Sequence, residues 1–260
     1  GNPQKTESDS YDVRIFTPEK EVQFSGHALL GCAFIVLELY SSQKMVESIA
    51  LQLPKKLVKV FVEYNESKID DSNAESGGAT PKFWIHEQEP EFGREFEKIL
   101  LSRILSIPPE SVDDTFPIIE VDTGLPMIVV PLTDLRSLKE ITINKKRYNW
   151  LVSQANAKCI LAFSSETNEP ENDLSVRVFA DYFGIPEDAA TGSGNGSLAA
   201  YLSKYNYFPE CGDELDLRIE QGYEIDRPSL LFAKCDVEGA QFSVKVGGNV
   251  VLVAEGKFLL

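Results

Sequence analysis

Hydrophobic and polar residues alternate along this chain in short runs, with few long helical stretches between them. Runs of this kind that are rich in β-branched and aromatic residues are typical of strands. They predict strands over residues 11–16, 46–53, 57–64, 81–86, 118–122, 127–131, 158–163, 176–179, 215–220, 229–237, 241–246 and 250–257. Apolar positions at helical spacing predict helices over residues 27–39, 91–105, 134–138 and 145–154. The pattern therefore indicates a β-rich α+β fold.

Three segments add detail to this prediction. The helix expected over residues 27–39 is apolar nearly all round, which indicates a helix enclosed by sheet. Residues 65–80 are polar and rich in Gly, Ser and Asp, and they are typical of a hairpin loop. Gly247-Gly248-Asn249 is typical of a tight turn that joins the last two predicted strands.

The chain contains two copies of one sequence pattern. Residues 13–28 and 176–193 each begin with Val-Arg, a β-branched residue and Phe, and each continues through an acidic stretch with a proline. Each copy then reaches a glycine among small residues and an apolar helix, which in the second copy we place from Gly194. The pattern predicts a duplicated strand-loop-helix unit whose two specialised points are helix N-termini.

A helix N-terminus attracts anions, because its first N–H groups lack intrahelical partners and the aligned peptide dipoles make that end electropositive. Two such ends that face each other could hold both ends of one small anion. Gly26 and the run Gly192-Ser193-Gly194-Asn195-Gly196 would let a ligand approach the main chain, since glycine has no Cβ. The alternative is that these glycines serve only tight strand-to-helix turns. The second copy of the pattern favours a binding site.

Length and composition agree with two similar halves. With 260 residues, of which 43% are hydrophobic, the chain can bury a full core, and its length is near twice that of a common domain. We place the boundary near residues 113–117, which gives domains over residues 1–117 and 118–250. The final strand, over about residues 250–260, is expected to return to the first domain.

Charge and cysteine usage exclude several classes of protein. Asp and Glu number 41 against 25 Lys and Arg, and the net charge of −16 repels nucleic acid and anionic membranes. No apolar run is long enough to span a bilayer and no signal peptide opens the chain, so a cytoplasmic protein is expected. The four cysteines show no C-x-x-C spacing and only two histidines exist, so neither a metal site nor a disulfide framework is predicted.

Six short motifs follow one another along the chain. They are Arg14-Ile15-Phe16-Thr17-Pro18, Ser25-Gly26-His27-Ala28, Glu187-Asp188-Ala189-Ala190-Thr191-Gly192-Ser193, Gln221-Gly222, Arg227-Pro228-Ser229 and Val246-Gly247-Gly248. Together they resemble the phenazine-biosynthesis PhzF-like family, which belongs to the diaminopimelate-epimerase-like fold. The resemblance runs from about residue 12 to the C-terminus. It implies two similar domains, each a β-barrel-like sheet wrapped around a central helix, with an active site in the cleft between them.

The resemblance also implies roles for single residues. His27 matches the family's active-site histidine, and Asp188 matches the aspartate of its second motif. Gly192 and Ser193 match positions whose backbone N–H groups, together with the Ser hydroxyl, hold the substrate carboxylate; we add Gly26 and Gly194 as neighbouring substrate-binding candidates. From the residues alone, a histidine at a helix start can pass a proton near neutral pH. The alternatives are a packing or capping role for His27 and a helix N-cap for Asp188.

Two departures from the family's relatives affect the expected chemistry. Racemases and epimerases of this fold place a Cys before each motif glycine, where this chain has Ser25 and Thr191. A hydroxyl is a far poorer base than a thiolate, so a two-thiol racemase is disfavoured, and Cys32 is expected to be an inert buried thiol. The family's catalytic Glu lies in a Ser-Glu-Thr strand that precedes the first copy. Here only nine residues separate Gly1-Asn2-Pro3 from Val13-Arg14, and Glu7 in this stretch is expected to be solvated.

The sequence thus predicts a PhzF-like isomerase that transfers a proton on a small carboxylate-bearing substrate, without a cofactor or metal. The family resemblance also implies a homodimer. The alternative function is a non-catalytic protein that lacks the catalytic Glu and serves in small-anion binding or as an interaction protein. The substrate itself is not encoded in any motif, because the loops that shape a pocket carry no transferable code.

Overall fold

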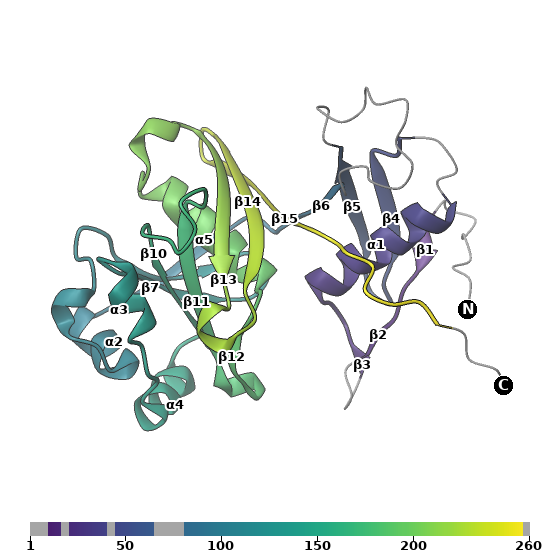
Figure 1. Cartoon of the computed structure of the whole chain (residues 1–260). Coiled ribbons are helices and arrows are strands. Elements are labelled where there is room, and N and C mark those ends of the chain that lie inside the picture. The colour runs from purple at the N-terminus through teal and green to yellow at the C-terminus, as the bar shows by residue number, and fades with distance from the viewer. Residues whose placement is uncertain (1–9, 17–20, 41–44, 65–80, 257–260) are drawn as a thin grey trace. The chain divides into compact units, whose positions relative to one another are not determined.

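The computed structural model describes most of the chain and divides it into two compact units (Figure 1). The described residues are 10–16, 21–40, 45–64 and 81–256. The first unit comprises Gly1–His86 and Gly247–Leu260, and the second comprises Glu87–Val246. Residues 87–117, which we expected in the first domain, belong to the second unit, because their strand and helix pack with its core. Residues 247–260 group with the first unit.

The first unit is a small sheet with one helix against it. In order across the sheet, its strands are β1 (Tyr11–Asp12), β4 (Ser48–Gln52), β5 (Leu57–Glu63) and β6 (Lys82–His86). β1 is parallel to β4, and the later pairs are antiparallel. A separate hairpin is formed by β2 (Ile15–Phe16) and β3 (Glu21–Val22), and it leads into helix α1 (Gly26–Tyr40). The strand expected over residues 11–16 is therefore two short strands.

Helix α1 buries one side against β4, β5 and β6. Leu29 and Ala33 have no exposed surface and pack with Leu51 and Val60 in an apolar cluster. The opposite side of the helix is open, since Ile35 is 41% exposed and Leu39 59%. The apolar sequence of α1 predicted a helix enclosed by sheet. Within the described residues, sheet covers only one side of it.

The second unit is built on a longer sheet. Its strands lie in the order β15 (Gln241–Asn249), β14 (Ser229–Glu238), β13 (Glu214–Gln221), β11 (Leu174–Ala180), β10 (Cys159–Ser164), β9 (Met127–Pro131), β8 (Ile118–Asp122) and β7 (Glu91–Phe96). The pairs β9–β10 and β11–β13 are parallel, and the short strand β12 (Ile185–Asp188) pairs antiparallel with β11. Short 3-10 turns occur at Pro109–Ser111, Asp181–Phe183, Pro209–Cys211 and Tyr223–Ile225. The last residues of β15, Gly247–Asn249, are counted with the first unit.

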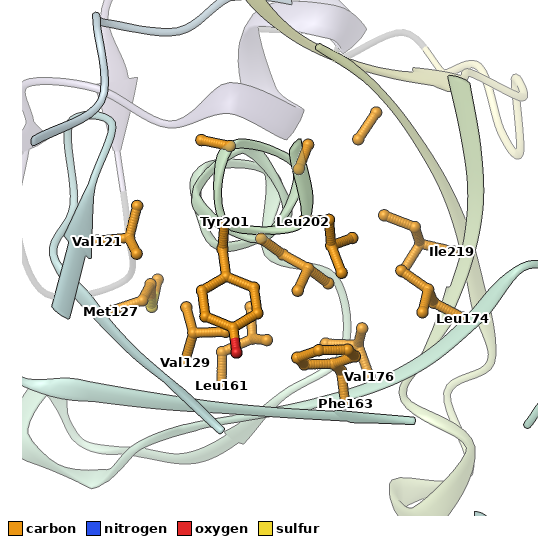
Figure 2. Packing of buried hydrophobic residues seen from close by; sticks show 14 of the residues in the cluster. Val121, Met127, Val129, Leu161, Phe163, Leu174, Val176, Tyr201, Leu202 and Ile219 are labelled. Carbon is orange, nitrogen blue, oxygen red and sulfur yellow. The ribbon is translucent and has the colours of Figure 1, made fainter. Parts of the chain in front are cut away.

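The sheet of the second unit curls around helix α5 (Gly192–Lys204), as Figure 2 shows. The helix is buried from Gly194 to Leu202, and Tyr201 packs edge-to-face on Phe163. Side chains from strands on several sides point toward it, among them Val121 and Ile219. Helix α5 is thus the central helix, wrapped by sheet, that the family resemblance implies for the second domain.

Three more helices cover the outer face of this sheet. They are α2 (Lys98–Leu105), α3 (Leu135–Lys139) and α4 (Lys145–Gln154). Because successive strand residues point to opposite faces, Met127 and Val129 face α5, whereas Ile128 and Val130 face these helices. Strand β9 is buried on both faces for this reason, and it reads as a continuous apolar run. No helix among the described residues has the length and apolar character needed to cross a membrane.

Four predictions about elements were wrong. Residues 91–96 form strand β7 rather than the start of a helix, because they pair with β8. Residues 185–188 form β12 where a loop was expected. Gly247 lies inside β15 rather than in a hairpin turn, and residues 250–256 form no strand. A Cβ at Gly247 would lie 2.6 Å from a ring carbon of Trp84 and 2.7 Å from the Phe83 carbonyl oxygen, so this glycine allows a close strand contact.

Candidate active site

The two copies of the sequence pattern have the same local structure. In the first copy the Arg14 guanidinium lies 4.8 Å from the Phe16 ring centre and donates two hydrogen bonds, of 2.9 and 2.8 Å, to the Glu21 carboxylate. In the second copy Arg177 lies 5.0 Å from the Phe179 ring centre and donates two bonds, of 2.8 and 2.7 Å, to Glu187. The structure therefore contains a duplicated strand pair that leads into a helix.

The Arg–Glu ion pair that both copies contain gives a common reference for comparing the residues at the two helix starts. Five positions separate the paired Glu from the helix glycine in both copies, so Gly26 corresponds to Gly192. His27 then corresponds to Ser193, and Asp188 corresponds to the half-buried Val22. The two copies therefore differ in their chemistry. The first copy has His27 where the second has Ser193, and the second has Asp188 where the first has Val22.

In the first copy, His27 is exposed at the first turn of α1. The Ser25 hydroxyl lies 3.4 Å from both ring nitrogens of His27, and the Ser25 carbonyl accepts the Leu29 N–H at 3.1 Å. A Cβ at Gly26 would meet no atom within 4 Å. The main chain at this helix start is therefore open to a ligand, with an imidazole beside it.

In the second copy, Asp188 is half-buried at the end of β12. Its Oδ2 atom accepts a 2.7 Å hydrogen bond from the Thr191 hydroxyl. Thr191 is the N-cap residue of α5 but makes no side-chain cap bond, because its hydroxyl is directed to Asp188. The first turn of α5 consequently keeps N–H groups for an anion.

The glycines at the start of α5 have different surroundings. A Cβ at Gly192 would lie 3.8 Å from a Val246 methyl, an ordinary contact, so the main chain there is accessible. A Cβ at Gly194 would lie 3.1 Å from Thr191 Cγ2 and 3.2 Å from Met127 Cε. Gly194 is buried, and its lack of a Cβ allows close packing of α5 on the sheet. The substrate contact expected for it stays a prediction. The half-buried Ser193 is held through its carbonyl, which accepts from the Thr123 hydroxyl at 3.2 Å.

A buried amide network that the sequence analysis did not single out supports this turn. Gln221, the last residue of β13, donates from Nε2 to the Asp188 carbonyl at 2.8 Å and to the Thr191 hydroxyl oxygen at 3.0 Å. Its Oε1 accepts from the Thr191 N–H at 3.2 Å and from Asn195 Nδ2 at 3.0 Å. Gln221 appeared in the sequence only as part of a family motif, and its role depends on partners far apart in the chain.

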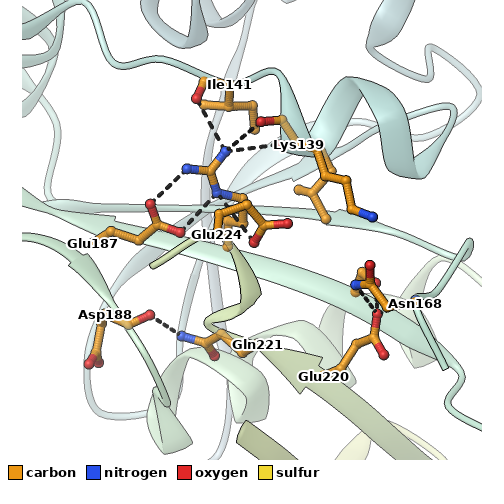
Figure 3. A network of polar contacts seen from close by, with 11 residues as sticks. Lys139, Ile141, Asn168, Glu187, Asp188, Glu220, Gln221 and Glu224 are labelled. Carbon is orange, nitrogen blue, oxygen red and sulfur yellow. Dashed lines mark hydrogen bonds and ion pairs between the residues drawn. The ribbon is translucent and has the colours of Figure 1, made fainter. Parts of the chain in front are cut away.

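Arg177 binds Glu187 of β12, and Figure 3 labels Glu187 together with two of the other acceptors of Arg177, Lys139 and Ile141. Its side chain is 8% exposed and is bound to Glu187, the residue before Asp188. Its Nη1 atom donates to three carbonyls at the end of α3, those of Leu138, Lys139 and Ile141, at 3.0, 3.3 and 3.2 Å. Strand β12 is thereby tied to α3 through Glu187, the residue before Asp188, while Gln221 holds the carbonyl of Asp188 itself.

Glu220 lies beside Gln221 and carries a buried negative charge. Its carboxylate accepts hydrogen bonds from the backbone N–H groups of Asn168 and Glu169 and from the side chains of Asn168, Asn172 and Ser175 (Figure 3). Burial alone would raise the pKa of Glu220, but these hydrogen bonds outweigh burial and hold the pKa below its usual value. The ionised side chain anchors residues 168–172 to the end of β13.

Three of the four cysteines, Cys32, Cys159 and Cys235, are placed for packing rather than for proton transfer. Burial raises the pKa of the Cys32 and Cys235 thiols, and it raises the pKa of Cys159 to about 12. Cys32 lines a groove of about 680 Å³ along α1, between that helix and residues 250–254. His27 is not among the residues that line this groove. A thiol with a raised pKa is a poor base at neutral pH, as expected for Cys32.

The described residues contain one Ser-Glu-Thr sequence, at residues 165–167. Its Glu166 accepts the Leu135 N–H at 3.0 Å and so binds the first turn of α3. It lies in the second unit, before the second copy of the pattern, whereas the family's catalytic Glu precedes the first copy. Glu7, the other candidate weighed from the sequence, lies outside the described residues.

Comparison with known proteins identifies the family. The model of the phenazine biosynthesis-like protein family matches residues 2–256. A trans-2,3-dihydro-3-hydroxyanthranilate isomerase of Pseudomonas fluorescens is 30% identical over 255 residues, which are 95% of this chain and 79% of that protein. A Bacillus anthracis phenazine biosynthesis protein of the PhzF family has a TM-score of 0.81 at 23% identity, over 98% of this chain and 82% of that one.

A more distant structure shares the fold. A hydroxyproline epimerase of Agrobacterium vitis has a TM-score of 0.56 at 11% identity, over 95% of this chain and 70% of that one. This likeness shows the epimerase-like α+β architecture alone. The duplicated pattern, the two helix starts and the match along nearly the whole chain agree, and the chain belongs to the phenazine biosynthesis-like PhzF family of isomerases.

Proposed function

We propose that this chain is an isomerase that moves a proton on a small carboxylate-bearing substrate without a cofactor. The observation that carries the proposal is the second helix start, where an aspartate lies beside an uncapped first helical turn. Asp188 Oδ2 accepts from Thr191, and Thr191 provides no cap to α5. The same turn of chain can therefore bind a substrate carboxylate and supply Asp188 beside it for proton transfer.

The substrate carboxylate is proposed to bind the N–H groups of Gly192 and Ser193. Supporting this assignment, a Cβ at Gly192 would make only an ordinary contact, so the main chain can be approached closely. The positive end of the α5 dipole favours an anion there despite the net charge of −16. The developing charge of an enolate-like intermediate would be stabilised by the same donors.

Asp188 and His27 are proposed to contact the reacting part of the substrate. Asp188 keeps Oδ1 for a substrate amine or hydroxyl, since Oδ2 accepts from Thr191. His27 is exposed at its own helix start, and an imidazole can accept or donate a proton near neutral pH. That both residues act on one molecule, as the family resemblance implies, stays a prediction.

The experiment uses trans-2,3-dihydro-3-hydroxyanthranilate, the substrate in the name of the Pseudomonas fluorescens relative, as the first probe. The chain is incubated with it in D₂O, and deuterium incorporation and product formation are followed by NMR and mass spectrometry. Asp188→Asn and His27→Ala are each expected to lower the rate by about 10²–10⁴-fold, the usual contribution of a positioned acid or base. Both should unfold at nearly the parental temperature.

Asp181→Asn is the matched control, because Asp181 lies between β11 and β12 but pairs with Lys145 at the surface. It should retain the parental rate. Cooperative unfolding of Asp188→Asn at a much lower temperature would instead assign a structural role to Asp188. Binding of the probe with no exchange above buffer would favour the alternative function, a non-catalytic anion-binding protein.

A further inference from the structure

We infer that Gln221 is a positioning residue that orients the Asp188 carboxylate through the Thr191 hydroxyl. The inference rests on the proposed function, and it concerns a residue that does not itself touch the substrate. Gln221 is 1% exposed and lies at the end of β13, where its side chain contacts the turn that joins β12 to α5. Its amide has two donor and two acceptor positions, and all four are used.

The orientation of this amide is determined by a neighbour that can only donate. The Thr191 N–H has no acceptor capacity, so the atom of Gln221 that faces it must be the oxygen. Asn195 Nδ2 donates to the same oxygen and also to the Thr191 carbonyl, at 2.9 Å. The Gln221 Nε2 group is therefore directed at the Thr191 hydroxyl oxygen.

The direction of the Thr191 proton follows. A hydroxyl has one proton to donate, and the Thr191 oxygen already accepts from Gln221 Nε2. Its proton is free for Asp188 Oδ2, 2.7 Å away. A directed chain of donors thus runs from Gln221 through Thr191 to Asp188, and it holds the carboxylate in one orientation.

The first copy of the pattern indicates that the fold does not require these polar residues. Asn195 corresponds to Leu29, three positions after the helix glycine in each copy. Gln221 pairs with Val176, and extending the β1–β4 register by one residue places Leu53 beside Val13, the counterpart of Val176. Leu29 and Leu53 are 0% and 1% exposed and belong to one apolar cluster. The copy without Asp188 is thus packed with leucines where the copy with Asp188 carries amides.

The end of β13 is rigid enough for this role. Glu220, the residue before Gln221, is held by the donors of residues 168–175 described above. Gly222, the residue after it, has φ of +85° and lies against the Ala189 carbonyl. Gln221 itself pairs with Val176 of β11 and Ser229 of β14, so strand pairing holds its main chain independently of the Glu220 side chain.

The test compares the pH dependence of kcat/KM in three variants of the whole chain. Gln221→Glu keeps the shape and still accepts from Thr191 N–H and Asn195, but it cannot donate to the Thr191 hydroxyl, whose proton turns to the new carboxylate. Thr191→Val removes the hydroxyl without adding charge. Both should move the acidic limb of the profile to higher pH by about one unit, because a carboxylate that loses a donor binds its proton more readily. Combining them should add little, since they interrupt the same chain.

Glu220→Gln is the matched control, a buried change on the same strand whose side chain binds residues 168–175 instead of Asp188. It should lower the unfolding temperature without moving the acidic limb. Thr191→Ser, which keeps the hydroxyl, should retain the parental profile. If Gln221→Glu and Thr191→Val lose stability while the limb stays in place, Gln221 only supports the turn and the inference is overturned.

A second readout does not depend on turnover. In chain labelled with ¹³C at the Asp side-chain carboxyls, the Asp188 resonance is assigned by its loss in Asp188→Asn, and its titration midpoint is measured. The midpoint should rise in Gln221→Glu and Thr191→Val and stay unchanged in Glu220→Gln. A parental chain that is inactive on the probe but shows this pattern would reject the proposed reaction and keep the positioning role of Gln221. Unchanged midpoints would reject that role.

Discussion

At the scale of single residues, the two copies of the pattern show how burial changes the value of the same ion pair. Arg14 and Arg177 bind a carboxylate with nearly equal hydrogen-bond lengths and lie over a Phe ring at similar distances. Their side chains, however, are 65% and 8% exposed. Water screens the first pair, whereas the second is shielded and also binds three carbonyls.

Arg177→Ala is therefore expected to lower the free energy of unfolding by about 3–5 kcal/mol, because Glu187 would be left as an unpaired buried charge. The measurement is urea unfolding followed by circular dichroism. Arg14→Ala is the matched control from the first copy, and its unfolding curve should nearly overlay the parental one. Equal and small effects of the two changes would contradict the proposed importance of burial.

Glu220 gives the stability of the chain a pH dependence of known sign. The hydrogen bonds that outweigh its burial hold its pKa below the usual Glu value, so the folded chain binds this proton less readily than the unfolded chain. The resulting stability is fully present above about pH 4.3, the ordinary Glu pKa, and is lost as pH falls through the lowered folded pKa. Glu220→Gln should be less stable than the parental chain at pH 7, since its new amide group faces donors, and the difference should narrow below about pH 4. Urea titrations from pH 7 downward measure it; a difference independent of pH would show that the charge of Glu220 is not involved.

At the scale of elements, the turn after β13 determines how β12 and α5 meet. Gly222 has φ of +85°, and a Cβ there would clash with the Arg227 carbonyl and lie 2.9 Å from the Ala189 carbonyl. A left-handed residue that is also packed between two backbone segments accepts no side chain. This single glycine thus brings residues 222–227 against the segment that follows Asp188.

Gly222→Ala should be much more destabilising than Gly184→Ala. Gly184 also has positive φ, +79°, but a Cβ there would meet no atom within 4 Å. The control is expected to cost only the left-handed conformation, about 1–2 kcal/mol, while Gly222→Ala adds two backbone clashes. Thermal unfolding of both variants measures the difference. Equal losses would mean that residues 222–227 move aside at no cost, and that the turn does not constrain the site.

At the scale of the whole molecule, the division into units follows the division of the apolar cores. The clusters around α5 and beneath α2, α3 and α4 draw all of their buried members from residues 96–244. The cluster beneath α1 draws its buried members from residues 15–85. Each unit thus has its own core. The homodimer that the family resemblance implies stays a prediction.

A fragment comprising residues 87–246 is accordingly expected to fold by itself. It is continuous in sequence and contains both of its apolar clusters, α5 and the Gln221 network. Far-UV and near-UV circular dichroism and thermal unfolding should show native structure and one cooperative transition. A fragment without near-UV signal, or with a broad transition, would show that the second unit requires residues outside this range.

The local pattern of apolar and polar residues predicted several strands and helices that the structure contains. Strands 118–122 and 127–131 and helix 145–154 have the bounds that their periodicity predicts. Of the helix predicted over residues 91–105, the part over 98–105 is helical, but residues 91–96 were misread because Phe92 and Phe96 have helical spacing. In β7 a register shift between Phe92 and Glu95 directs these two rings to different apolar clusters, which a regular strand would not do. Pairing with β8, a non-local interaction, decided the element.

The duplication, the family, both helix starts and the candidates His27, Asp188, Gly192 and Ser193 could be inferred from local sequence, because each depends on residues close together in the chain. That Gly194 allows close packing, and that Gln221 holds the Asp188–Thr191 turn, became evident from the folded chain. The physical reason is that a buried amide gains its role from partners 26 to 33 positions away. Which donors and acceptors meet there is determined by strand pairing and helix packing, and no local pattern records it.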